Sequence, residues 1–142
     1  MGINEFQILH SDVIKCYQLV ENDLKLIYAF IMDKDLEQTL NEVENITLGT
    51  IINKLEEYDK STEPQIISDN DYNFLKQIKD NRNFWAHENY LEFIYEESPL
   101  ESEAYKKQCK RLAKDHKRME NVYRNVEALR NKCREIWVKH HS

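Results

Sequence analysis

Glycine and proline are scarce in this chain, which has only Gly2, Gly49, Pro64 and Pro99 among its 142 residues. A sheet protein needs turn residues at most of the connections between its short strands, and this chain has too few of them. The scarcity therefore argues for a few long helices. Charged residues make up 32% and hydrophobic residues 41% of the chain, a mix that suits helices with one apolar stripe each. At this length we expect one domain, residues 1–142, with a single core.

Long apolar runs and targeting signals are missing as well. No run approaches the ~20 apolar residues of a membrane-spanning helix, and residues 1–12 lack the basic and apolar regions of a signal peptide. The three cysteines, Cys16, Cys109 and Cys133, form no Cys-x-x-Cys pair, which favours reduced thiols over a zinc site. We therefore expect a cytoplasmic protein that does not enter a membrane.

Several enzyme motifs are also lacking. The chain has no phosphate-cradling glycine loop, no His-Glu-x-x-His zinc motif and no nucleophile elbow. The sequence accordingly predicts neither a metal site nor a cofactor.

The net charge of -6 is divided unevenly along the chain. Residues 101–142 carry 12 Lys and Arg against 6 Asp and Glu, a balance of +6, which leaves -12 for residues 1–100. A basic final segment on an acidic body is compatible with binding a polyanion such as RNA. It is equally compatible with packing against an acidic surface or with an ordinary solvated face.

Apolar residues recur every seven positions in the first and last parts of the chain, which predicts two long helices at about 4–33 and 102–139. His10 falls on the seam of the first helix, where we expect it to be hydrogen-bonded rather than catalytic. Arg130 interrupts one column of the last helix. The columns of the first helix are Phe6, Val13, Val20 and Ile27, with Tyr17, Leu24 and Ile31; those of the last are Tyr105, Leu112, Met119, Val126 and Cys133, with Cys109, His116, Tyr123 and Trp137.

Two shorter helices are predicted between them. Thr47 caps a helix that reaches about Asp59, and Gly49 within it costs ~1 kcal/mol relative to alanine, so a close approach by another helix is one reason for its presence. Residues 34–46 form a short helical turn or a loop. Ser68 or Asp69 begins a further helix that we expect to continue to about Glu97. The sequence thus predicts an all-α bundle of two long and two shorter helices.

The most informative stretch is DNRNFWAHENY, residues 80–90. We expect Arg82 in the middle of an apolar face, where its charge must be paired, directed toward solvent or placed at a cleft. His87 lies about 140° around the helix from Arg82 and shares a flank with Asn83 and Tyr90. The residues expected on the apolar face itself are Phe74, Leu75, Ile78, Trp85 and Ala86.

Arginine, a neighbouring amide and an imidazole suit the chemistry of a phosphodiester. Arginine offers a fixed fork of donors to phosphate oxygens, and histidine can take or give a proton near neutral pH. The spacing alone is not distinctive, because Arg111 precedes His116, and Arg134 precedes His140 and His141, at similar intervals. Arg82 differs in being followed directly by a polar residue and then by apolar ones. A purely structural role is the alternative, with Arg82 paired to a buried carboxylate, Asn83 in a local hydrogen bond and His87 packed in the bundle.

This motif and the helix order resemble the HEPN family of small all-α domains. The family's motif is Arg, four to six residues, then His, usually with a polar residue after the Arg, and Arg82, Asn83 and His87 match those three positions. The segment TLGTIINKLEE is similar to the short second helix of many members. The resemblance covers most of the chain by helix order but is specific only over residues 80–90.

The resemblance implies a metal-independent endoribonuclease, usually a homodimer whose two motifs meet in one cleft. A ribose 2′-hydroxyl would attack the adjacent phosphate, leaving a 2′,3′-cyclic phosphate and a 5′-hydroxyl. In this reaction His87 would act as general acid or base, Arg82 would stabilise the charge on phosphorus, and Asn83 would orient His87 or the phosphate. Lys79 and Tyr90 are further candidates for contacts with the RNA substrate.

Such domains often act as toxins or in phage defence, beside an antitoxin or a nucleotidyltransferase partner. Members silenced by adenylylation usually carry Tyr two residues after the His, whereas this chain has Asn89 there and Tyr90 next, which puts that regulation in doubt. The alternative function is a non-catalytic helical dimer that binds RNA or nucleotide, or serves as a scaffold beside such a partner.

Overall fold

The computed structural model describes all 142 residues and contains five α-helices, two short 3₁₀ helices and no strand. The all-α prediction is therefore confirmed. Two of the helices are long, and α2 occupies the segment for which the sequence left a helical turn or a loop open. The elements are α1 (Ile3–Ile31), α2 (Leu36–Val43), α3 (Leu48–Lys60), α4 (Asp69–His87), η1 (Asn89–Glu92), η2 (Pro99–Glu101) and α5 (Glu103–His141).

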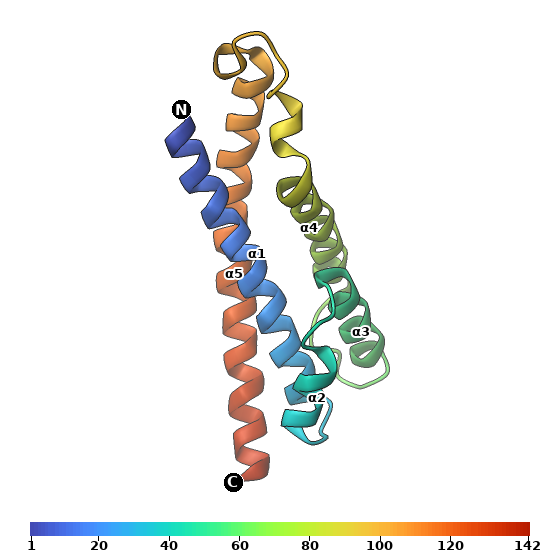
Figure 1. Cartoon of the computed structure of the whole chain (residues 1–142). Coiled ribbons are helices and arrows are strands. Elements are labelled where there is room, and N and C mark those ends of the chain that lie inside the picture. The colour runs from blue at the N-terminus through green and yellow to red at the C-terminus, as the bar shows by residue number, and fades with distance from the viewer.

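The two long helices α1 and α5 lie side by side and run in the same direction (Figure 1). The Tyr105 hydroxyl donates to the Met1 carbonyl at 3.0 Å, and Arg130 donates to Asp23 at 2.8 Å, so the register stays nearly constant along the pair. The seven-residue repeats of the two helices form this contact. The buried members of the columns are Phe6, Val13, Tyr17, Val20, Leu24 and Ile27 on α1, and Tyr105, Leu112, Met119, Val126 and Cys133 on α5.

Helix α4 runs back antiparallel to α5, and α3 covers only the first part of α4 (Figure 1). Lys76 of α4 bonds Glu56 of α3 at 2.6 Å. Gly49, near the start of α3, lies against Lys79, since a Cβ on Gly49 would be 2.7 Å from the Lys79 Cδ. The close neighbour of Gly49 is thus the side chain of Lys79, and no backbone atom of α4 lies closer than 3.9 Å to that Cβ position. Because α3 begins here, the turns of α4 beyond Lys79 have no covering from α3.

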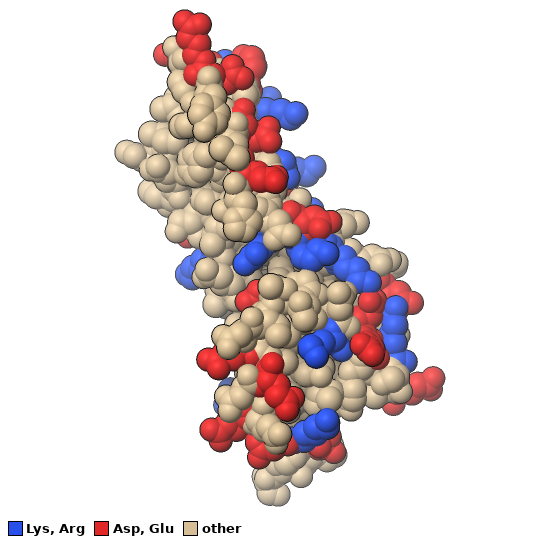
Figure 2. Space-filling model, turned by 45° about the vertical axis from the view of Figure 1, so that its right-hand side comes forward, with Lys and Arg blue, Asp and Glu red and all other residues tan.

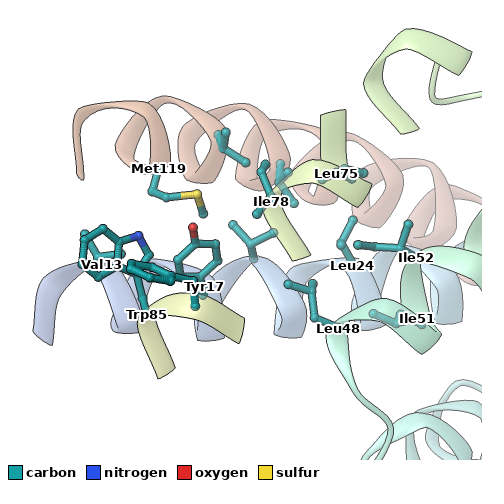
Figure 3. Packing of buried hydrophobic residues seen from close by; sticks show 14 of the residues in the cluster. Val13, Tyr17, Leu24, Leu48, Ile51, Ile52, Leu75, Ile78, Trp85 and Met119 are labelled. Atoms are coloured by element: carbon teal, nitrogen blue, oxygen red, sulfur yellow. The ribbon is translucent and has the colours of Figure 1, made fainter. Parts of the chain in front are cut away.

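The core fills the space between α1, α3, α4 and α5, as the side chains in Figure 3 show. Asp59, in the last turn of α3, has a fully buried carboxylate at the edge of this core. Asp59 accepts hydrogen bonds from the backbone of Ile66 at 2.7 Å and Ile67 at 2.9 Å, and from the Tyr72 hydroxyl at 2.7 Å. One carboxylate thereby ties the loop after α3 to the first turn of α4, because all its bonds run to that segment.

Side chains cap four helices, with Asp35 at the start of α2, and the caps at Thr47 and Ser68 were predicted. The hydroxyl of Thr47 accepts from the Thr50 backbone, and those of Ser68 and Ser102 cap α4 and α5 in the same way. Each cap satisfies one of the unpaired backbone donors of a first turn. No helix in the structure has both the length and the apolar character needed to cross a membrane.

The expected end of the α4 helix at about Glu97 is wrong, since α4 ends at His87. In a continuing helix the Trp85 carbonyl would accept from the Asn89 backbone. It accepts instead from the Asn89 side chain at 3.2 Å and lies 2.7 Å from His10 Nε2. His10 is therefore a hydrogen-bonded seam residue, as predicted. Beyond this point Phe93 turns inward and packs on Phe6.

Candidate functional site

The three motif residues occupy the last two turns of α4. Arg82 is half-buried, and its Nη1 donates to the Asn83 Oδ1 at 3.3 Å. Asn83 and His87 are exposed. The Arg82 guanidinium therefore turns toward the flank that Asn83 shares with His87, one helical turn later. The charge of Arg82 is thus directed toward solvent, which is one of the three environments expected for it.

Of the three contacts that a purely structural role would make, the local hydrogen bond of Asn83 is formed and the other two are not. Arg82 has no carboxylate within 4.0 Å, and its one side-chain hydrogen bond goes to the neighbouring Asn83. His87 is exposed rather than packed in the bundle, and its imidazole makes no hydrogen bond within the chain. An Arg, an amide and an imidazole thus face solvent together at the end of one helix.

Of the three other Arg–His spacings, two lead to histidines that have partners within the chain, and the third leads to His140, which is exposed like His87. His116 Nε2 lies 3.7 Å from a carboxylate oxygen of Asp12 and 3.6 Å from one of Glu120. His141 stacks on Trp137 with ring centroids 4.3 Å apart and lies 3.7 Å from an Asp33 oxygen. These two histidines take part in contacts within α5 and between α5 and the α1 side of the molecule. The Arg82 motif differs from them because its imidazole has no such partner.

The two candidate substrate contacts lie in different places. Lys79 is one turn before Arg82, with its stem over Gly49 and its Nζ 3.8 Å from an Asp80 oxygen. Tyr90 lies beyond the end of α4 and faces α1, with its ring centroid 5.9 Å from that of His10. Since the helix has ended, Tyr90 does not share a flank with His87. The structure keeps Lys79 on the motif helix and separates Tyr90 from the motif.

Arg111 of α5 is a residue that the sequence did not point to. Its guanidinium carbon lies 3.6 Å above the centre of the Phe84 ring, and Phe84 directly follows Asn83 in the chain. The arrangement is a cation–π contact between α4 and α5. It places a second guanidinium on the α5 side of the motif. The heptad pattern indicated that Arg111 is next to the buried Leu112. It did not indicate which helix packs against Arg111.

Two neighbours of the motif test the predicted apolar face of α4. Trp85 is buried as expected, and its indole Nε1 donates to Asp115 at 2.6 Å. Ala86 is exposed, so its expected burial is wrong. Ala86 lies on the side of α4 that packs against α3 in the earlier turns of α4. Because α3 begins beside Lys79, it does not reach Ala86. Phe84 is buried instead, under Arg111.

The surface charge around α4 is mixed. Figure 2 shows Lys and Arg side chains gathered in a band about halfway along the face made by α3 and α4, with acidic side chains toward both ends. Helix α4 itself carries Lys76, Lys79 and Arg82 within two turns. Lys76 is paired with Glu56, whose pKa is lowered mainly by that hydrogen bond. Lys79 lies near Asp80, so of the three cations of α4 only Arg82 has no carboxylate partner and remains able to hold an anionic group.

In comparisons with protein families, with curated proteins and with solved structures, nothing matches this chain. The fold and the site define an all-α helical bundle with a half-buried Arg82 and the exposed Asn83 and His87 in the last two turns of one helix. Chemically, such a set can bind a phosphate through the guanidinium and exchange a proton through the imidazole.

Proposed function

We propose that this protein is a metal-independent endoribonuclease of the HEPN type. One observation carries the proposal: the Arg82 guanidinium is turned toward Asn83, on the flank that holds His87, and all three groups are available to a ligand. Such a group of cation, amide and imidazole supports transfer at a phosphodiester without a metal.

In the proposed reaction the 2′-oxygen of a ribose bonds to the adjacent phosphorus, and the bond to the 5′-oxygen breaks. Arg82 stabilises the extra negative charge on the phosphate oxygens, and Asn83 orients the phosphate or His87. One proton must leave the 2′-oxygen and another must reach the 5′-oxygen. Each chain supplies one motif histidine, so a homodimer that joins two motifs offers one imidazole as base and one as acid.

The proposed setting is the cytoplasm, with a role as a toxin or in phage defence. An antitoxin or a nucleotidyltransferase is the proposed partner class. Asn89 takes no part in the adenylylation pattern and is buried, with its amide committed to the Trp85 carbonyl. Control by a bound protein therefore fits this chain better than control by modification at that position.

A second candidate is a non-catalytic helical dimer that binds RNA or nucleotide, or that holds a partner protein. The net charge of -6 favours it, because an acidic protein attracts RNA less than a basic one does. In this case the motif binds without cleaving, and replacement of His87 leaves function intact.

The test is cleavage of a mixed RNA pool, in excess EDTA, by the wild type and by two variants. We expect the wild type to leave cyclic-phosphate ends and His87→Ala to lose activity by at least roughly a hundredfold. His140→Ala is the matched control, since His140 is also exposed but lies at the far end of α5, and it should cleave like the wild type.

Two results would overturn the proposal. No cleavage by folded wild-type protein would transfer the assignment to the binding or scaffold role. Equal cleavage by the wild type and His87→Ala would mean that the activity belongs to a contaminant or to another site.

A further inference from the structure

The segment between α4 and α5, residues 88–103, forms one end of the molecule and exposes an unusual share of apolar surface (Figure 1). We refer to these residues as the acidic tip. Leu91 is 59% exposed, Ile94 47%, Tyr95 86% and Leu100 46%. Single exposed apolar residues are common on proteins, but a contiguous group in one short segment marks a surface that binds something.

The same segment is strongly acidic. Glu88, Glu92, Glu96, Glu97, Glu101 and Glu103 are all exposed. No Lys or Arg occurs between Arg82 and Lys106, and of the six only Glu103 is paired, with Lys106 at 3.2 Å. Figure 2 shows the result at the upper end of the molecule, where uncharged surface is edged by acidic side chains. A ligand for this surface must therefore be both apolar and positively charged.

The tip is also held in one shape. Phe93 at its centre is buried and packs on Phe6 and Tyr105, with ring centroids 5.7 and 5.0 Å away. Leu91 lies in the short 3₁₀ helix η1 and Leu100 in η2, with Ile94 and Tyr95 between the two. A segment fixed in this way loses little conformational freedom when a partner binds, which favours affinity.

The charge of the tip narrows the choice of partner. RNA, DNA and anionic lipid surfaces are repelled by the five glutamates that have no cation partner. Contact between two copies of the tip across a twofold axis would bring these five carboxylates of each chain together. A basic segment of another protein meets neither difficulty, and an amphipathic helix offers apolar and cationic side chains on adjoining faces.

We propose that the acidic tip is a docking surface for a basic amphipathic helix of a partner protein. Leu91, Ile94 and Tyr95 receive its apolar face, and the glutamates pair with its flanking cations. The proposal is independent of any nuclease activity, because it uses no residue of the Arg82 motif.

The experiment measures binding of a fluorescent helical peptide built only of leucine and lysine in an amphipathic pattern, by anisotropy. We expect saturable binding that weakens as salt rises, and no binding of the leucine–glutamate counterpart. The double variant Ile94→Ser/Tyr95→Ser should lose roughly tenfold in affinity, and so should the triple variant Glu92→Gln/Glu96→Gln/Glu97→Gln. Backbone hydrogen exchange should show protection by the peptide within residues 88–103.

The matched control is Glu37→Gln/Glu42→Gln/Glu44→Gln, which removes three exposed carboxylates from α2 and its C-cap instead. It should bind the peptide within about twofold of the wild type. An equal loss in the control would show attraction to bulk charge and would overturn the proposal, as would a failure of the wild type to bind. A folded wild-type dimer that the Ile94→Ser/Tyr95→Ser variant turns into a monomer would assign the tip to a second copy of this chain instead.

Discussion

Tyr17 is buried in the seam between α1 and α5, and its hydroxyl has no hydrogen-bond partner. Figure 3 shows the hydroxyl pointing toward the Met119 side chain, whose thioether is a weak acceptor. Burial, and next the nearby Asp115 charge, raise the pKa of Tyr17 well above its ordinary value of 10.0. The residue therefore contributes apolar packing at the cost of an unsatisfied polar group.

We predict that Tyr17→Phe stabilises the protein by about 1 kcal/mol near neutral pH, because it removes that buried hydroxyl and leaves the ring. The folded state holds the Tyr17 proton more tightly than the unfolded state does. The stability from this group is thus complete below pH 10 and is lost as the pH rises beyond it. Urea unfolding at about pH 8 and about pH 11 should show a smaller alkaline loss in the variant than in the wild type.

Tyr95→Phe serves as the control for this measurement, since Tyr95 is 86% exposed and should change stability little at either pH. A destabilisation by Tyr17→Phe of more than about 1 kcal/mol would contradict the prediction, because it would mean that the hydroxyl makes a favourable bond.

The helical elements were largely predictable, and the exceptions have a common cause. Seven-residue repeats specify which side of α1 and α5 is buried, and capping residues specify where α3, α4 and α5 begin. The end of α4 depends on His10, which is distant in sequence and lies 2.7 Å from the Trp85 carbonyl. Likewise Ala86 is exposed because α3 starts too late to cover it. Local patterns therefore predicted the helices, while tertiary contacts set where α4 ends and which of its residues are exposed.

The pairing of α1 with α5 explains the arginine that interrupts the second column of α5. Arg130 donates to Asp23 at 2.8 Å, and Asp23 is only 1% exposed. Burial raises the pKa of Asp23, while the hydrogen bond and charge of Arg130 act in the opposite direction. The ion pair lets a charged residue occupy the seam between two helices, provided that both partners are present.

We predict that Arg130→Met destabilises the protein by about 2 kcal/mol at neutral pH, because it leaves the Asp23 charge buried and unpaired. This predicted loss is small for the breaking of a buried ion pair, because the Arg130 side chain is 27% exposed and solvent screens its charge. Without Arg130 the pKa of Asp23 rises further above its ordinary 3.8, so the folded state binds the proton more tightly than the unfolded state. The deficit should therefore shrink as the pH falls toward about 4, measured by urea unfolding.

Two further variants test whether the loss of stability in Arg130→Met comes from breaking the Asp23–Arg130 ion pair. Arg134→Met, at an exposed position one turn later on α5, should change stability little. Asp23→Leu/Arg130→Leu should recover much of the loss, since an apolar pair needs no charge compensation. An unchanged deficit across pH in Arg130→Met would indicate that lost packing, rather than the Asp23 charge, causes it.

Over the whole molecule, acidic and basic side chains gather in different regions of the surface. The acidic tip lies at one end, and a band of cations crosses the face of α3 and α4 midway (Figure 2). An RNA strand on this surface would approach the band and avoid the tip, since its phosphates follow the local field rather than the net charge. Arg111 of α5 stacks on Phe84, the residue after Asn83, and so adds a guanidinium at the contact between α4 and α5.

We predict that Arg111→Gln weakens the binding of a fluorescent single-stranded RNA about three- to tenfold, and that the dependence of affinity on salt becomes shallower by about one phosphate contact. Arg111→Lys should retain most of the affinity if charge is what matters, whereas a stacked guanidinium would not be replaced by lysine. The control is Arg124→Gln, because Arg124 is an exposed arginine of α5 that lines the α1 side with Asp12 and Lys15. Equal losses in the Arg111 and Arg124 variants would mean that RNA responds to the total charge of α5 and would remove Arg111 from the site. A loss confined to Arg111 would place the RNA across the α4–α5 contact, beside the three motif residues.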